Sequence, residues 1–177
     1  MDVFSHGLWS GALFKFFNIR LKKKFSFWKA VFWGMFPDVF AFAIPFAMMF
    51  FYAISGQIDF SNLPHPSSVE PAIPQIDSLF QMSNSLYNIS HSIIVFTIIF
   101  IIAYLIFKKP VWILGGWLLH ILIDVPTHSY QFYPTPIFWP ISSWKFDGFG
   151  WANEWFLIAD AVLLIIVYFY LLRKERK

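Results

Sequence analysis

Residues 111–128 read VWILGGWLLHILIDVPTH, and this stretch places a histidine and an aspartate in a segment otherwise apolar enough to enter a bilayer. His120 and Asp124 are four residues apart, so on a helix they lie on one face. An ionisable side chain in hydrocarbon is costly unless it is paired or coordinated. The stretch therefore predicts a membrane helix that presents an imidazole and a carboxylate to a shared partner.

Three further residues with good metal-binding side chains occur inside or at the ends of apolar segments, namely His6, Asp38 and His91. Two carboxylates and three imidazoles favour a divalent metal ion as the shared partner. The sequence has no cysteine, so its ligands must be nitrogen and oxygen atoms. Such a set suits zinc first, with manganese or iron as alternatives, and one or two ions. For any one histidine the competing interpretation is a hydrogen-bonded polar residue between packed helices.

The composition is that of an integral membrane protein. Of its 177 residues, 58% are hydrophobic and 13% are charged, whereas soluble domains carry about 25% charged residues. The formal charge is +3, and most of the basic residues lie in blocks at residues 20–29, 108–109 and 173–177, each beside an apolar run. This follows the positive-inside rule, and no nucleic-acid partner is expected. No cleavable signal peptide is expected either, because no basic region precedes residues 3–17.

The hydrophobic runs predict an all-α fold, a polytopic helix bundle forming one membrane-embedded domain over residues 1–177. Four transmembrane helices are expected at residues 25–55, 86–107, 111–125 and 151–172. Residues 3–19 are short for a crossing and predict an amphipathic or partly inserted helix. Pro37 should kink or break the second run at residues 35–38, and Pro126 should stop the helix at residues 111–125.

Two segments are expected to be loops on the non-cytoplasmic side. Residues 56–85 are rich in proline and contain no lysine or arginine, and residues 127–150 are rich in aromatic side chains typical of the headgroup region. The C-terminus is then cytoplasmic. With this topology Asp38, His91, His120 and Asp124 come to one depth, and His6 joins them if the first helix enters from the same side.

Several other residues have open interpretations. His128 is a further ligand, a proton shuttle or an exposed interfacial histidine. Asp160 is either a partner that orients a ligand histidine or a lone polar contact. Lys145 either contacts a substrate phosphate or extends to the surface. His65 is expected to be uninvolved, and Gly115 with Gly116 is expected to serve helix packing.

The short motifs resemble a known family. Ser5-His6, Pro37-Asp38, Ser90-His91-Ser92 and the HILID sequence of residues 120–124 followed by Thr127 are similar to the bacterial LexA-binding, inner-membrane-associated metal-dependent hydrolases. The resemblance implies a helical protein of the bacterial inner membrane with a metal site. A fainter similarity to zinc-dependent phospholipase C covers Asp38, His91, His120, Asp124 and His128, but that enzyme's later histidine and glutamate ligands are missing.

These patterns predict a metal-dependent hydrolase that acts on a phosphoester or ester of a lipid or other amphiphile. His6, Asp38, His91, His120 and Asp124 would bind metal, and Asp124 or His128 would serve as general acid or base. A metal-binding, transport or sensing protein is the alternative, and a structural membrane protein is a third. The sequence contains no phosphate-binding loop, no serine nucleophile elbow and no H-E-x-x-H motif, so other common hydrolase and kinase classes lack support.

Overall fold

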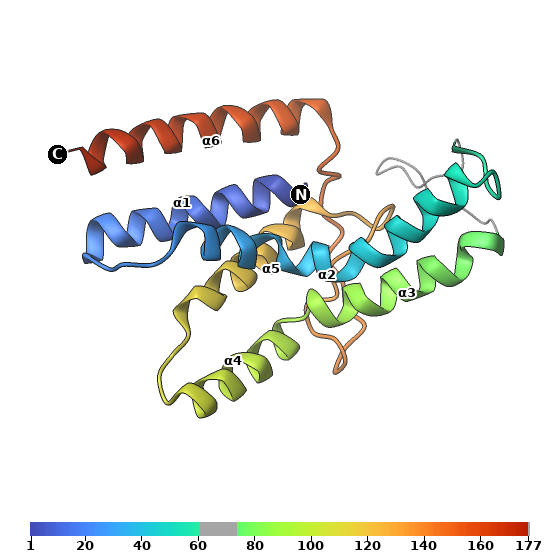
Figure 1. Cartoon of the computed structure of the whole chain (residues 1–177), viewed down its shortest axis with the longest axis horizontal. Helices are drawn as coiled ribbons and strands as arrows, with labels where there is room; N and C mark the ends of the chain where they lie inside the picture. Colours follow the sequence, from blue (N-terminus) through green and yellow to red (C-terminus); the bar gives the residue numbers. More distant parts are fainter. Residues whose placement is uncertain (61–73, 177) are drawn as a thin grey trace.

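The computed structural model describes residues 1–60 and 74–176 (Figure 1). This part of the chain is all-α, with six α-helices, one 3-10 helix and no extended strand. The elements are, in order, α1 (Val3–Leu21), α2 (Phe27–Ile54), α3 (Pro74–Ser90), α4 (Ile93–Phe107), η2 (Trp112–Leu114), α5 (Gly115–Thr127) and α6 (Glu154–Glu175).

Helix α1 lies at the centre of the bundle and contacts α2, α5 and α6 (Figure 1). It begins at Asp2, whose carboxylate accepts hydrogen bonds from the backbone of Phe4 and Ser5 and so caps the first turn. Its buried face consists mostly of small and polar residues, which let neighbouring backbones approach closely. The amphipathic or partly inserted helix expected at residues 3–19 is thus a regular helix that packs against three others, and its position in a membrane stays a prediction.

Helix α2 is continuous from Phe27 to Ile54 although it contains Pro37 and Pro45. Of the kink or break expected at residues 35–38, the break is therefore wrong. Both prolines are buried, and each removes one backbone hydrogen bond from a helix that has many others. Figure 1 shows that α2 changes direction along its length and stays helical.

The segment expected to be one clean membrane helix at residues 86–107 is two helices, α3 and α4, which meet at an angle of 57°. The break falls at His91 and Ser92. The Ser92 hydroxyl accepts hydrogen bonds from the backbone of Ile94 and Val95, so it caps a new helix at this point.

Helix α3 also corrects the expected loop at residues 56–85, because residues 74–85 are helical. Leu79, Phe80, Ser83 and Tyr87 are buried at helical spacing, on the side of α3 that packs against α2. The segment is mostly polar, so its sequence predicted a loop and not a helix with a narrow buried face. His65 lies outside the described residues.

The boundaries of the last two helices differ by a few residues from those expected from the sequence. Helix α5 includes Pro126 in its last turn instead of ending before it, and a 3-10 turn precedes it. Helix α6 begins at Glu154 and not near residue 151. Residues 128–153 are irregular, and the backbone of Gly148, Phe149 and Trp151 donates hydrogen bonds to carbonyls at residues 126–128. This loop is thereby tied to the end of α5.

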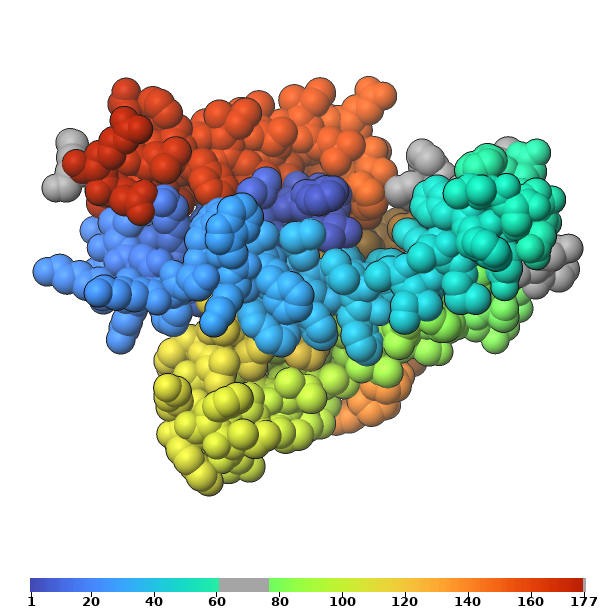
Figure 2. Space-filling view, viewed as in Figure 1, coloured from blue at the N-terminus to red at the C-terminus, as the bar shows by residue number. Residues whose placement is uncertain are grey.

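Two described helices, α2 and α6, are long and apolar enough to cross a membrane, and the bent pair α3 and α4 makes a third if it counts as one span. Residues 112–127 form a shorter apolar helical segment. Many large apolar side chains on α4 and α6 are exposed, and Figure 2 shows α6 as an outer ridge along α1. The chain thus has two to three candidate membrane spans.

Gly116 lies where α1, α2 and α5 pack most closely. A Cβ atom there would lie 2.5 Å from Ser10 Oγ and 3.1 Å from the Ala30 carbonyl oxygen. A Cβ atom on the neighbouring Gly115 would meet no close atom, since the nearest, on Phe14, would lie 3.5 Å from it.

We therefore expect Gly116→Ala to lower the free energy of unfolding by about 1–3 kcal/mol. Gly115→Ala should leave it unchanged or raise it by up to about 1 kcal/mol, because alanine favours helix more than glycine. Thermal unfolding of the detergent-solubilised protein measures both. Equal melting temperatures for the two variants would contradict the close packing of the three helices.

Candidate metal centre

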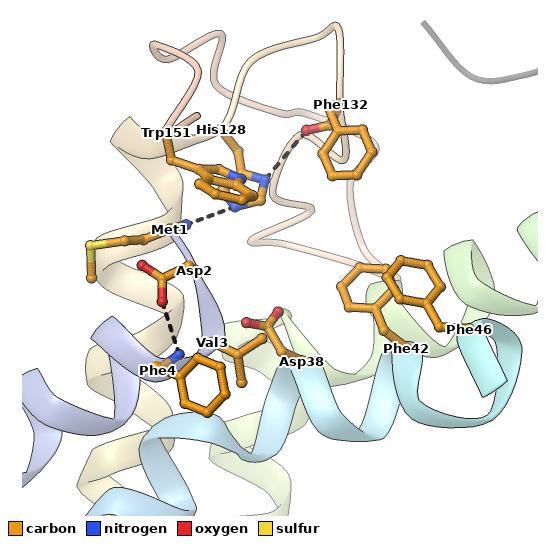
Figure 3. A pocket seen from close by; sticks show the side chains of 10 residues that line it. All are labelled: Met1, Asp2, Val3, Phe4, Asp38, Phe42, Phe46, His128, Phe132 and Trp151. Atoms are coloured by element: carbon orange, nitrogen blue, oxygen red, sulfur yellow. Dashed lines mark hydrogen bonds between the residues drawn. The ribbon is translucent and has the colours of Figure 1, made fainter. Parts of the chain in front are cut away.

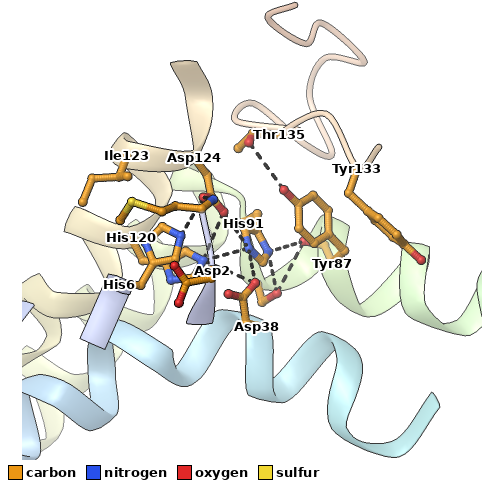
Figure 4. A network of polar contacts seen from close by, with 12 residues as sticks. Asp2, His6, Asp38, Tyr87, His91, His120, Ile123, Asp124, Tyr133 and Thr135 are labelled. Carbon is orange, nitrogen blue, oxygen red and sulfur yellow. Dashed lines mark hydrogen bonds and ion pairs between the residues drawn. The ribbon is translucent and has the colours of Figure 1, made fainter. Parts of the chain in front are cut away.

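Five ionisable residues predicted from the sequence meet in the interior of the bundle (Figure 4). They come from four places in the fold, namely α1, α2, the break between α3 and α4, and α5. All five are at most 5% exposed, and they are His6, Asp38, His91, His120 and Asp124. Burial at this level removes water as a partner, so the groups must satisfy one another or a bound ion.

Asp38, His91, His120 and Asp124 each offer one ligand atom, and these atoms all lie within 4.8 Å of one another. His91 Nε2 lies 3.0 Å from His120 Nε2 and 3.3 Å from Asp124 Oδ2, which in turn lies 3.1 Å from His120 Nε2. Asp38 Oδ1 is 3.5 Å from the first imidazole and 3.6 Å from the second. Ligand atoms around a tetrahedral zinc ion with bonds near 2.0–2.1 Å are separated by roughly 3.3 Å. The four atoms therefore have the spacing of a metal site.

The backbone fixes which ring nitrogens face this point. His120 Nδ1 donates to the Gly34 carbonyl oxygen at 2.6 Å, and His91 Nδ1 lies 3.2 Å from the Tyr87 carbonyl oxygen. The Gly34 carbonyl oxygen only accepts, so His120 Nδ1 carries a proton and His120 Nε2 presents a lone pair to the cluster. His91 Nδ1 also lies 2.9 Å from the Ser90 hydroxyl, which can donate or accept. His91 Nε2 lies 3.0 Å from the lone pair of His120 Nε2, a position that a proton or a metal cation would stabilise. A carbonyl partner on the outer nitrogen is the arrangement that metal-bound histidines adopt.

Asp124 contacts the histidines of the cluster and the amino group of Met1. Its Oδ1 contacts His6 Nε2 and the Met1 amino nitrogen, each at 2.8 Å, and His128 Nε2 at 3.3 Å. Its Oδ2 faces His91 and His120 and makes no hydrogen bond within the described part of the chain. A buried carboxylate oxygen without a donor is expensive, and a cation at the four-residue group would compensate it.

His6 lies beside the four-residue group, with its ring stacked on that of His120 at 3.6 Å between centroids. Neither of its ring nitrogens has a hydrogen-bond partner among the described residues, although Nε2 is close to Asp124. The structure therefore brings His6 to the cluster as predicted, and its role as a ligand stays a prediction.

His128 is buried and not an exposed interfacial residue. Its Nδ1 lies 3.0 Å from the Tyr133 carbonyl oxygen, and its Nε2 is 3.0 Å from the Met1 amino nitrogen. It therefore presents Nε2 to the same carboxylate, Asp124, that the other histidines contact. Of the three interpretations from the sequence, the exposed one is wrong.

The other candidates lie elsewhere. Asp160 accepts a hydrogen bond from Trp9 Nε1 at 2.7 Å, so it joins α6 to α1 and orients no histidine of the cluster. Lys145 lies in the irregular loop, where its carbonyl accepts from the Tyr130 hydroxyl. Neither residue contacts the four-residue group in the described structure.

Sequence analysis missed the backbone part of the site. The carbonyls of Gly34 and Tyr87 orient the two central imidazoles, and the Tyr87 ring stacks on His91 with 3.7 Å between centroids. Tyr87 and His91 are four residues apart, which is the one signal that the sequence offers for this pair.

A cavity of about 300 Å³ opens beside the cluster (Figure 3). Asp38 belongs both to its wall and to the four-residue group, and His128 lines it as well. The rest of the wall is largely apolar. A small molecule in this cavity would therefore reach the metal-binding groups directly.

The chain was compared with models of protein families, with curated proteins and with solved structures, and none of them matches. The class that fold and site define is an all-α protein with candidate membrane spans and a buried His/Asp cluster that could bind a metal ion.

Metal binding should stabilise the protein, because an ion that binds only the folded state shifts the unfolding equilibrium. With zinc or manganese at about 100 times its dissociation constant we expect a gain of about 2.7 kcal/mol, seen as a higher melting temperature. His91→Ala and His120→Ala should lose the gain and the bound metal. Asp160→Asn, a matched change of a buried acid outside the cluster, should keep both. Full metal content in His120→Ala would rule out the assigned site.

Proposed function

We propose that this protein is a membrane-bound, metal-dependent hydrolase. The observation that carries the proposal is the convergence of two Nε2 atoms and two carboxylates on one point, with the ring of His120 oriented by its hydrogen bond to the Gly34 carbonyl. Nitrogen and oxygen ligands without thiolate suit zinc, manganese or iron. A divalent ion held there would supply Lewis acidity and a hydroxide nucleophile near neutral pH.

The position of Asp38 supports a catalytic use over a purely structural one. It is the most distant member of the four-residue group, and it faces the cavity (Figure 3). Structural zinc sites are closed on all sides, whereas catalytic sites keep a position open to substrate. The cavity places that open side at Asp38 and His128, so a scissile bond would enter there.

His128 and Asp124 are the residues best placed to move a proton. Nδ1 of His128 is held by backbone carbonyls, and its Nε2 lies 3.3 Å from Asp124 Oδ1 at the edge of the cavity. An imidazole with one nitrogen fixed can take a proton from water at the other and pass it to a leaving group. Asp124 would hold that imidazole in place and stabilise its charged form.

Asp124 also allows a second ion. Its Oδ2 faces His91 and His120, while its Oδ1 faces His6 and His128, so Asp124, His6 and His128 would be the residues to hold a second ion. In this structure the Met1 amino group lies on the Oδ1 side. One ion at the four-residue group is the minimum that the proposal needs.

A transport or sensing function is the second candidate, and one observation favours it. His91 lies at the 57° break between α3 and α4, and transporters place their ion ligands at breaks of this kind. Coordination alone would suffice for that function, so metal binding without turnover is the result that would select it.

The proposal includes a location in the bacterial inner membrane. We infer four crossings, by α2, the bent pair α3 and α4, the segment of residues 112–127, and α6, with the basic C-terminus in the cytoplasm. The substrate would then be a lipid or another amphiphile carrying an ester or phosphoester bond. The cavity, which lies next to exposed apolar helices, suits such a molecule.

Turnover should separate the residues by role. We expect the metal-loaded protein to hydrolyse at least one member of a panel of long-chain 4-nitrophenyl carboxylic esters and phosphodiesters. His128→Ala should keep its metal and lose about 10²–10⁴-fold in kcat, the usual contribution of a general acid or base. His91→Ala should lose metal and turnover together. No hydrolysis of any substrate by the metal-loaded protein would overturn the enzyme assignment.

Topology can be measured independently of activity. Reporter fusions after residue 176 should report a cytoplasmic position, and fusions within residues 139–149 should report the opposite side, because the lysine and arginine blocks lie at the other end of the helices. Both reporters on one side would contradict the proposed crossings.

A further inference from the structure

The cavity beside the cluster is divided into a polar end and an apolar end. Asp2, Asp38 and His128 form the polar end near the metal-binding groups (Figure 3). The other seven lining residues are apolar: Phe42, Phe46 and Phe132 form the apolar end, and Met1, Val3, Phe4 and Trp151 lie beside the polar residues (Figure 3). Its volume of about 300 Å³ is at the lower end of the range for ligand pockets, so it suits one hydrocarbon chain and not several.

The charge around the polar end is negative without a metal. Asp2 and Asp38 line the cavity, and Asp124 lies directly behind them in the cluster. No lysine or arginine is among the described residues that line it. The amino group of Met1 is the nearby cation, and it is paired with Asp124 at 2.8 Å.

One divalent ion at the four-residue group brings the sum of these charges to zero, and to −1 if the amino group is not counted. Sites that bind phosphate have a clear excess of positive charge, from arginine, lysine or clustered metal ions. An anionic phosphoester would here meet two carboxylates at the entrance with no arginine to pair with. A neutral electrophile avoids that repulsion.

We propose that the substrate is a neutral carboxylic ester with a single long acyl chain, which lies along Phe42 and Phe46 while its carbonyl group faces Asp38 and His128. This inference rests on the proposed hydrolase function and narrows its substrate from ester or phosphoester to carboxylic ester. Water adds to the carbonyl carbon and gives one proton to His128, and the C–O bond to the alcohol then breaks. The departing alkoxide takes that proton from His128, so the products are a carboxylic acid and an alcohol.

The first experiment compares two substrates with the same leaving group and chain length, 4-nitrophenyl decanoate and 4-nitrophenyl decyl phosphate, on the zinc-loaded protein in detergent. We expect turnover of the decanoate and none of the phosphodiester. Turnover of the phosphodiester with a kcat/KM equal to or above that of the ester would overturn the substrate class while leaving the hydrolase function in place. No turnover of either substrate would instead count against the hydrolase function itself.

Because carboxylic esters are also intrinsically more reactive, the second experiment isolates the charge. Asp2→Asn removes one negative charge and keeps a good helix cap. Decyl phosphate should inhibit decanoate hydrolysis about tenfold more strongly in Asp2→Asn than in wild type, whereas neutral 1-decanol should inhibit both equally. An inhibition constant for decyl phosphate that is the same in Asp2→Asn and wild type would refute the proposal that the carboxylates of the cavity exclude anionic substrates.

The third experiment tests the chain position. Phe46→Trp adds volume inside the cavity, so it should raise the KM for the decanoate at least fivefold more than the KM for the butyrate. The matched control is Phe50→Trp, one turn further along α2 on an exposed position outside the cavity wall. Equal effects of the two variants on the decanoate would place the chain elsewhere and refute the proposal.

Discussion

The buried carboxylate of Asp124 is the constraint on which the rest of the structure depends. A charge removed from water costs several kcal/mol unless other groups compensate it, and Asp124 is completely buried. The compensating groups come from the start of α1, from the break before α4 and from the end of α5, and all of them contact the Asp124 carboxylate. Helices α1, α2 and α5 and the break before α4 thereby share one polar centre.

Close packing is a second consequence of the same requirement. For His6 to stack on His120, the backbones of α1, α2 and α5 must nearly touch, and Gly34 and Gly116 lie at that place. The carbonyl that orients His120 belongs to Gly34 itself. One glycine thus allows the approach of α1 and supplies the hydrogen bond that sets the tautomer of His120.

Sequence reasoning found the site more accurately than the helix boundaries. Ionisable residues in apolar runs are few, and their cost makes convergence predictable, so His6, Asp38, His91, His120 and Asp124 could be named together. The residue at which a helix ends depends on smaller free-energy differences, between helical and non-helical backbone. Pro37 predicted a kink or a break, and α2 continues without a break. The mostly polar composition of α3 predicted a loop, because its buried apolar residues are few. The carbonyl partners of the histidines left no trace in the sequence, because every residue has a carbonyl.

The attachment of α6 has a consequence for how the protein is assembled. Three polar contacts at different heights join α6 to α1, namely Trp9 with Asp160, the Leu8 carbonyl with Tyr168, and Lys15 with Glu175. During synthesis α1 emerges long before α6, so Trp9 has no partner on α6 until the last helix is made. Asp160 then fixes the height at which that helix docks. A lineage that lost either member of the Trp9 and Asp160 pair would be under pressure to change the other, and the two positions should vary together.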